Sequence, residues 1–254
     1  MRYGVMSKKI PLAMVAFLAL NGFGRTALAQ SLPAPRVVSS SQFDSGPNLL
    51  PYLTMTLPAG VEAGQLLLAT IAIQGSSNIV NPWATIILPA GGWTELVPSP
   101  ATCGGDLAMS IAYRIAQPSD TPQTQFTWGF LSDGYLTPVL ASGGMMNIAN
   151  VSTTNPIEQI NALCTTAALS VTAQPLNTLH NNAMSVLVYG ITGNNDLSRP
   201  VGYSQIFQHI VYGVGPDITN DTKVIPVAGT NTGYQISNAA QAGDGMGFQL
   251  SLAP

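Results

Sequence analysis

Charged side chains are scarce in this chain. They make up 7% of its 254 residues, where about a quarter is ordinary for a globular protein. Four of the eight basic residues lie within residues 1–29, so residues 30–254 hold four basic against eleven acidic residues, a net charge of −7. Those four basic residues are Arg36, Arg114, Arg199 and Lys223. Binding to nucleic acid or to an anionic membrane surface needs clustered Lys and Arg, so we expect neither partner.

Catalytic residue types are also few. The chain has two histidines, His180 and His209, and no G-x-S-x-G motif, so serine hydrolase chemistry is disfavoured. A glycosidase needs two carboxylates on either side of one bond. Glu95 and Glu158 fall in expected strands, and the other acids considered fall in expected turns, namely Asp106, Asp120, Asp133, Asp196, Asp217, Asp221 and Asp244. A glycan-active hydrolase or lyase therefore ranks last among our functional hypotheses.

Only two cysteines are present, Cys103 and Cys164. Without a nearby histidine cluster they do not make a zinc site. In an exported protein they are free to oxidise, and we favour a disulfide between them over two separate buried thiols. Such a bridge would close a loop of about 60 residues and stabilise the fold by roughly 4 kcal/mol.

Helical periodicity and aromatic girdles are lacking as well. No segment holds a 3.6-residue apolar period over three turns, and Ser237–Ala242 is the best, short, helical candidate. Aromatic residues amount to 7% and form no paired girdles of the kind that flank membrane-spanning strands. We expect no membrane insertion.

The N-terminus has the residue pattern of a leader peptide. Basic residues in Met1–Ile10 precede an apolar run, Pro11–Phe23, and then Ala27–Ala29. This is the pattern of a secretory signal peptide, and the run is too short to span a bilayer. We expect residues 1–29 to be removed and residues 30–254 to form one exported, extracellular or cell-surface domain.

Strands are indicated throughout residues 30–254. Gly and Pro recur every 8 to 15 residues, between stretches that alternate or run apolar. Gln65–Ile73 is continuously apolar and predicts a central strand covered on both faces. Met109–Ile115 has large apolar residues at alternate positions, which predicts one inward and one outward face. Around a dozen such strands predict an all-β fold, an antiparallel β-sandwich in a single domain.

Several short motifs occur in a familiar order along the chain. They are Gly64–Ala69 (GQLLLA), Pro89–Thr94 (PAGGWT), Ala112–Arg114 (AYR), Phe126–Trp128 (FTW), Asn155–Glu158 (NPIE) and Gln249–Pro254 (QLSLAP). This order resembles exported bacterial β-sandwich domains of unassigned activity, although Gln65 stands where their pattern has an acid. The resemblance implies a jelly-roll-like sandwich with an extracellular role, and it carries over no catalytic residue.

The glycine and aromatic residues of these motifs also have a structural interpretation. Gly91 and Gly92 permit a tight turn before Trp93, and we expect Trp93 and Trp128 to anchor the core. Gly243–Gly247 (GDGMG) precedes a strand rather than a helix, so we interpret it as a hairpin or bulge rather than a phosphate loop.

Two candidate ligand sites follow from residue types. Trp83 and Tyr135 lie in loop-like contexts and form the aromatic pair that we would choose for glycan binding. Asp217, Asn220 and Asp221 supply hard oxygen atoms of the kind that Ca²⁺ prefers, but lack the spacing of a recognised calcium loop. No other cofactor is expected.

The sequence leaves three functional hypotheses. The first is a secreted, non-enzymatic structural or adhesive β-sandwich that associates with itself as an oligomer or filament. The expected edge strands lack the lysine residues that usually prevent such strands from pairing with another copy. The second is a carbohydrate-binding module for a surface glycan, and the third is the glycan-active enzyme.

Overall fold

The computed structural model describes residues 32–75, 85–97, 101–120, 123–132, 134–193, 195–209 and 215–254. Residues 1–29, and Trp83 of the expected aromatic pair, lie outside this range. The described residues contain strands and turns but no helix. Among them, accordingly, there is no helix of a length and hydropathy that would cross a membrane.

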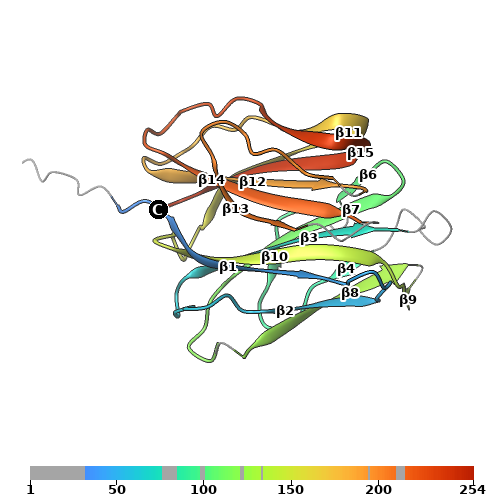
Figure 1. The fold of residues 1–254 in the computed structure, drawn as a ribbon. Coiled ribbons are helices and arrows are strands. Elements are labelled where there is room, and N and C mark those ends of the chain that lie inside the picture. Colours follow the sequence, from blue (N-terminus) through green and yellow to red (C-terminus); the bar gives the residue numbers. More distant parts are fainter. Residues whose placement is uncertain are drawn as a thin grey trace, which may run out of the picture. The chain divides into compact units, whose positions relative to one another are not determined.

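Fifteen strands form three antiparallel sheets among the described residues (Figure 1). The sheet that we call sheet A has the order β1-β10-β3-β7-β5, with β6 also pairing with β7. Its strands are β1 (Arg36–Asp44), β3 (Leu66–Gln74), β5 (Thr94–Glu95), β6 (Ala101–Cys103), β7 (Leu107–Ile115) and β10 (Leu140–Ala149).

The other two sheets lie on either side of sheet A. Sheet C has the order β2-β8-β4, with β9 also pairing with β8, and its strands are β2 (Tyr52–Thr56), β4 (Thr85–Ile87), β8 (Gln125–Ser132) and β9 (Tyr135–Leu136). Sheet D has the order β11-β15-β12-β14-β13. Its strands are β11 (Ile157–Ala173), β12 (Ala183–Ile191), β13 (Ser204–His209), β14 (Asp217–Ile225) and β15 (Gln235–Leu252).

Strand β3 shows why sheet A occupies the middle. Its residues from Leu66 to Ile73 are all buried. Leu67, Ala69, Ile71 and Ile73 pack in one cluster with side chains of sheet C. Leu66, Leu68 and Ala72 pack in a second cluster with side chains of sheet D. Successive side chains of a strand point to opposite faces, so an unbroken apolar strand requires a partner on both sides, and the prediction of a covered central strand is confirmed.

The prediction of an outward face for Met109–Ile115 is wrong. Ser110 and Arg114 are buried, because sheet C covers the face that a two-sheet sandwich would leave in water. Arg114 pairs with Asp120 at 2.7 Å and lies 4.9 Å from the Phe126 ring centroid. The all-β antiparallel sandwich is confirmed, with three sheets in the stack.

An aromatic cluster fills the space between sheets A and C. Trp93 packs edge-on against Phe126 and against Trp128, with ring centroids 5.2 Å apart in each pair. Both tryptophans are buried, as the sequence predicts for core anchors.

The outer face of sheet D is covered by the sheet's own longest strands. One end of the β11–β15 pair, residues Ser170–Ala173 with Gln235–Asn238, folds back over this face, and we call it the flap. Val171 and Ala173 of the flap are buried in one cluster with Leu187, Tyr189 and Ile191 of β12. A loop formed by residues 195–203 continues the cover, since Ser198 exchanges hydrogen bonds with Ser237 and Asn238.

The glycines of the 243–247 segment make room for the flap. A Cβ atom at Gly245 would lie 2.5 Å from Val171 Cγ2, and one at Gly247 would lie 2.5 Å from the Thr172 carbonyl oxygen. The β11–β15 register also shifts here, between Thr165 and Ala168 and between Ala168 and Ser170, so the expected bulge is present. The helical candidate Ser237–Ala242 is wrong: it belongs to β15, because β11 supplies an extended partner.

Candidate functional site

The disulfide joins two sheets at one side of the sandwich. Cys103 on β6 of sheet A is bonded to Cys164 on β11 of sheet D, with Cα atoms 5.3 Å apart. The predicted bond is confirmed. Because β11 is the terminal strand of sheet D, the bond anchors that edge to the neighbouring sheet.

The expected calcium ligands lie on β14, which is a strand where the sequence suggested turns. Asp217 and Asp221 face the outer side of sheet D with Thr219, whereas Asn220 faces sheet A, because alternate residues of a strand point to opposite faces. Asn220 Nδ2 donates a hydrogen bond of 3.0 Å to Thr70 Oγ1 on β3. The fold therefore separates Asn220 from the two carboxylates. The described residues hold no group of three or more His, Cys, Asp or Glu side chains that could bind a metal ion.

Asp221 lies in a buried polar cluster beneath the flap and the loop 195–203. Neither of its carboxylate oxygens accepts a hydrogen bond from a described residue, and the Tyr189 hydroxyl and Gln249 Oε1 are also buried without such a partner. Beside them, Gln249 Nε2 donates to Ser185 Oγ at 2.9 Å and to the Tyr203 hydroxyl at 3.2 Å. Burial raises the pKa of Asp221 from an ordinary value of 3.8 to about 7, and the charge of Arg199 partly offsets this.

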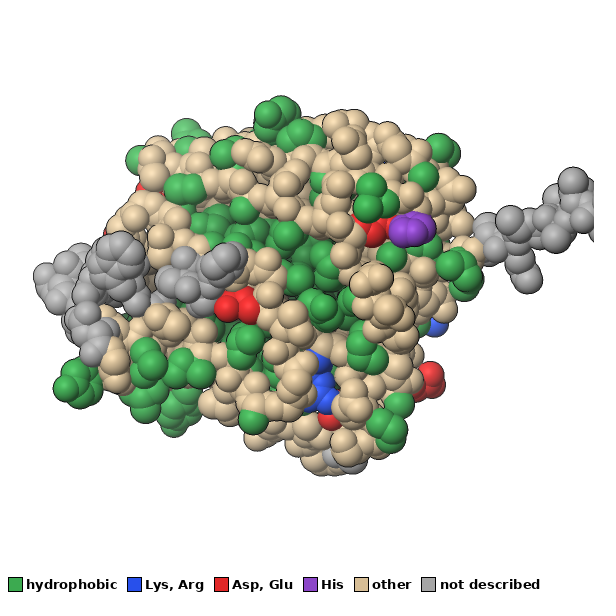
Figure 2. Space-filling view, turned by 180° about the vertical axis from the view of Figure 1, so that it is seen from behind, with side chains coloured by type: hydrophobic (Ala, Val, Ile, Leu, Met, Phe, Trp, Pro, Cys, Tyr) green, Lys and Arg blue, Asp and Glu red, His purple; other side chains and the backbone are tan. Residues whose placement is uncertain are grey.

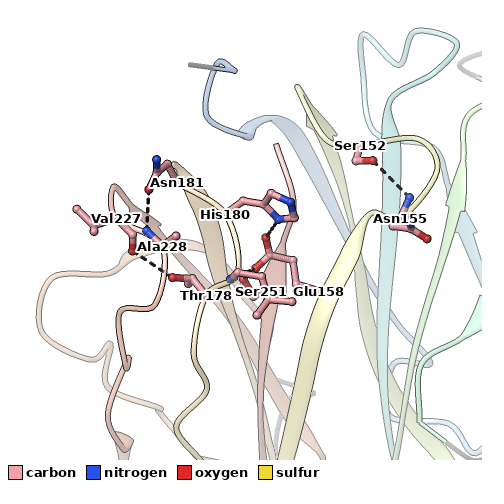
Figure 3. A network of polar contacts seen from close by, with 10 residues as sticks. Ser152, Asn155, Glu158, Thr178, His180, Asn181, Val227, Ala228 and Ser251 are labelled. Carbon is pink, nitrogen blue, oxygen red and sulfur yellow. Dashed lines mark hydrogen bonds and ion pairs between the residues drawn. The ribbon is translucent and has the colours of Figure 1, made fainter. Parts of the chain in front are cut away.

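A second polar network was not foreseen from the sequence. Glu158 at the start of β11 accepts hydrogen bonds from Ser251 Oγ at 2.5 Å, from the Leu179 backbone at 3.0 Å and from His180 Nδ1 at 2.6 Å (Figure 3). The His180 side chain is 60% exposed and that of Glu158 is 2% exposed. Burial alone would raise the pKa of Glu158, but the hydrogen bonds from Ser251, Leu179 and His180 outweigh it and lower the pKa below its ordinary 4.5.

This network does not have the arrangement of a Ser-His-Asp triad. In a catalytic triad the histidine contacts the serine and the carboxylate contacts the histidine. Here Ser251 donates to Glu158 rather than to His180, and Ser251 is fully buried. The second histidine, His209, pairs with Asp44 of β1. The arrangement of both histidines fits structural pairing between segments that are distant in sequence.

Tyr135 of the expected aromatic pair is on the short strand β9, where it is 78% exposed. Its neighbour Leu136 pairs with Leu131 of β8 and faces the outer side of sheet C, so Tyr135 points away from that side. The exposed aromatic residue on the outer face of sheet C is instead Tyr52 of β2. The alternation of Tyr52-Leu53-Thr54-Met55 could have revealed it, since Leu53 and Met55 are the inward residues.

The edge strand β11 is a further feature of interest. It runs along one end of sheet D, and only β15 pairs with it among the described strands (Figure 1). From Gln159 to Ala173 it contains no charged residue. Comparison of the whole chain with protein-family models, with curated proteins and with solved structures gave no match.

Proposed function

We propose that this protein is an exported, non-enzymatic structural or adhesive module whose copies associate through the free edge of β11. The observation that carries the proposal is the length and chemistry of that edge. A strand at the end of a sheet presents unpaired N–H and C=O groups, and natural proteins usually protect such a strand with Lys, Pro or a short length. Strand β11 has seventeen residues, and past Glu158 none of them is charged or proline.

The regular part of the edge is the segment Gln159–Thr165. The register of β11 with β15 is unbroken there, whereas bulges interrupt it farther along at Ala168. Ala162 is exposed within this segment, and Leu169, beyond the first bulge, is an exposed large apolar side chain. A second copy of the chain could pair antiparallel along Gln159–Thr165, with Ala162 inside the contact and Leu169 at its border.

Low charge and the disulfide support the same proposal. Like-charge repulsion between two copies at this edge is small because Glu158 is the one charged residue of β11. Cys164 ties the segment to sheet A through Cys103, which keeps the strand extended before a partner arrives, and preorganisation of this kind favours binding. An isologous β11–β11 contact gives a two-fold dimer. A filament would require a second surface.

The Ser251–Glu158–His180 geometry supports the non-enzymatic part of the proposal, because Ser251 is buried and its hydroxyl bonds to Glu158 rather than to His180. Export rests on the leader pattern of residues 1–29. The disulfide is compatible with an oxidising, extracellular location.

The proposal is tested by light scattering during size-exclusion chromatography of residues 30–254. The wild-type chain should elute with at least twice the mass of one copy at micromolar concentration. Ala162→Lys, which places a charge on the regular edge segment, should shift it to one copy. Val201→Lys is the matched control, since Val201 is 97% exposed in a turn of the loop 195–203, outside the segment Gln159–Thr165, and it should leave the mass unchanged. A monomeric wild type, or an Ala162→Lys variant that assembles normally, would refute the proposal.

A further inference from the structure

Among the described residues, none covers the outer face of sheet C, whereas the faces of the other two sheets are covered. Sheet A is covered on both sides, and the flap covers sheet D. On sheet C the inward residues are buried and the outward ones are partly or fully exposed, as the alternating burial of β2, β4 and β8 shows. The outward residues of these strands include Tyr52, Thr54, Ile87, Gln125, Thr127 and Gly129.

Apolar side chains gather at one end of this face, around a glycine. Tyr52 and Ile87 pair with Gly129 from its two sides and are 48% and 41% exposed. A Cβ atom at Gly129 would lie 3.6 Å from Ile87 Cδ1 and 3.8 Å from Leu136 Cδ2. Because Gly129 has no side chain, its backbone is recessed between the side chains of Tyr52, Ile87 and Leu136. Figure 2 shows hydrophobic side chains gathered at the lower left, at the end of the molecule where β8 and β9 meet in Figure 1.

Neutral hydrogen-bonding groups continue the face along the same strands. Thr54 Oγ1 and Thr127 Oγ1 are 2.8 Å apart, and Gln125 Nε2 lies 3.4 Å from Thr56 Oγ1. The four strands of sheet C contain no charged residue. An exposed tyrosine ring thus stands beside a row of hydroxyl and amide groups, without a cation or a carboxylate in the strands.

This chemistry matches an uncharged sugar polymer. A sugar ring offers a C–H face that can lie on an aromatic ring, and hydroxyl groups that both donate and accept hydrogen bonds. Tyrosine supplies an apolar ring with a polar end, and threonine and glutamine supply donors and acceptors. An anionic polymer would find no Lys or Arg on these strands, and the charge of residues 30–254 would repel it.

We infer that the outer face of sheet C binds a neutral polysaccharide. Tyr52 stacks on a sugar ring that lies over the Gly129 backbone, and Gln125 and Thr127 form hydrogen bonds with hydroxyl groups of the polysaccharide. This site is on a different sheet from the β11 edge and does not depend on self-association.

The test is retention of residues 30–254 on insoluble neutral polysaccharides, namely cellulose, chitin and a β-1,3-glucan, with alginate as the anionic control. At least one neutral polymer should retain the protein, and Tyr52→Ala should lower the bound fraction at least tenfold. Tyr52→Phe should keep most of the binding, which shows that loss in Tyr52→Ala does not come from a lost hydroxyl. Tyr234→Ala is the matched control, because Tyr234 is also an exposed tyrosine, beside the flap, and it should bind as the wild type does.

Three outcomes would overturn the inference: no retention on any neutral polymer, retention on alginate alone, or unchanged binding by a folded Tyr52→Ala variant. The thermal midpoint of each variant establishes that it is folded. Ala162→Lys should bind polysaccharide normally even when it is monomeric, so failure of the edge proposal and failure of the glycan site are distinguished by separate measurements.

Discussion

Asp221 is the single residue whose environment has the clearest consequence. It lies on the outer face of β14 next to Thr219, below the loop 195–203, and its carboxylate lacks hydrogen bonds from described residues. A buried ionised carboxylate in such a place is costly, so the group holds its proton to higher pH. The cluster of Asp221, Tyr189 and Gln249 is therefore a group of buried polar side chains with hydrogen-bonding atoms that no described residue satisfies.

This raised pKa predicts a specific dependence of stability on pH. The unfolded chain loses the Asp221 proton near pH 4 and the folded chain near pH 7. Between these values the folded state binds more protons, so this contribution to the free energy of unfolding falls as the pH rises, by about 4 kcal/mol in all. Urea unfolding of the wild type at pH 5, 6, 7 and 8 should show the decline.

Asp221→Asn removes the titrating group while keeping the side-chain shape. The variant should lack this decline between pH 5 and 8 and should be more stable than the wild type at pH 8. Glu158 contributes in the opposite direction and outside this range. Its pKa is lowered on folding, so its contribution is present above its ordinary value and is lost as the pH falls through the folded value. Parallel pH profiles for wild type and variant would contradict the assignment.

At the scale of elements, the flap depends on glycines at alternate positions of β15. Gly247→Ala should destabilise the protein by about 1–3 kcal/mol, because its methyl group would overlap the Thr172 carbonyl and force the flap to lift. Gly105→Ala is the control, since a Cβ atom there meets nothing within 4 Å. Denaturant unfolding of the two variants checks this, and equal effects would show that the flap does not press on Gly247.

The disulfide is the second feature that acts at the scale of secondary-structure elements. Its cysteines are 61 residues apart, so the chain-entropy model assigns it about 4 kcal/mol. Cys103→Ser combined with Cys164→Ser should lower the free energy of unfolding by about that amount. Reductant should destabilise the wild type similarly and leave the double variant unchanged. If adding reductant under denaturing conditions did not change the unfolding midpoint of the wild type, a structural role for the bond would be contradicted.

The local pattern of apolar and polar residues predicted some strands well and others poorly. The apolar run of β3 predicts a doubly covered strand because every side chain must find a partner, and the structure agrees. The even positions of β7 looked solvent-facing because periodicity cannot reveal a third sheet. Asp217–Asp221 looked like a turn because its residues are turn formers, yet β12 and β13 flank it and make it a strand.

The candidate sites were harder to predict because they join segments that are distant in sequence. Glu158, His180 and Ser251 come together from three such segments, and no local spacing signals this. Asp217, Asn220 and Asp221 are close in sequence, but strand alternation separates Asn220 from the other two. Tyr52 was within reach of a period-two analysis, whereas its neighbours Ile87 and Leu136 depend on sheet pairing.

At the scale of the whole molecule, the two proposed surfaces lie on one compact unit. Residues 31–254 form one compact unit, with the β11 edge on sheet D and the neutral face on sheet C, and sheet A between them. Few charged side chains interrupt the surface seen in Figure 2. A module of this kind would hold a polymer with one face while an edge pairs with a second copy.

Hydrogen–deuterium exchange of residues 30–254 at high and at low protein concentration tests the edge most directly. The account predicts that amide protons of Gln159–Thr165 exchange more slowly at high concentration, while those of the already paired strand β8 do not change. Equal exchange of Gln159–Thr165 at both concentrations, or slowing confined to another strand, would contradict association through β11.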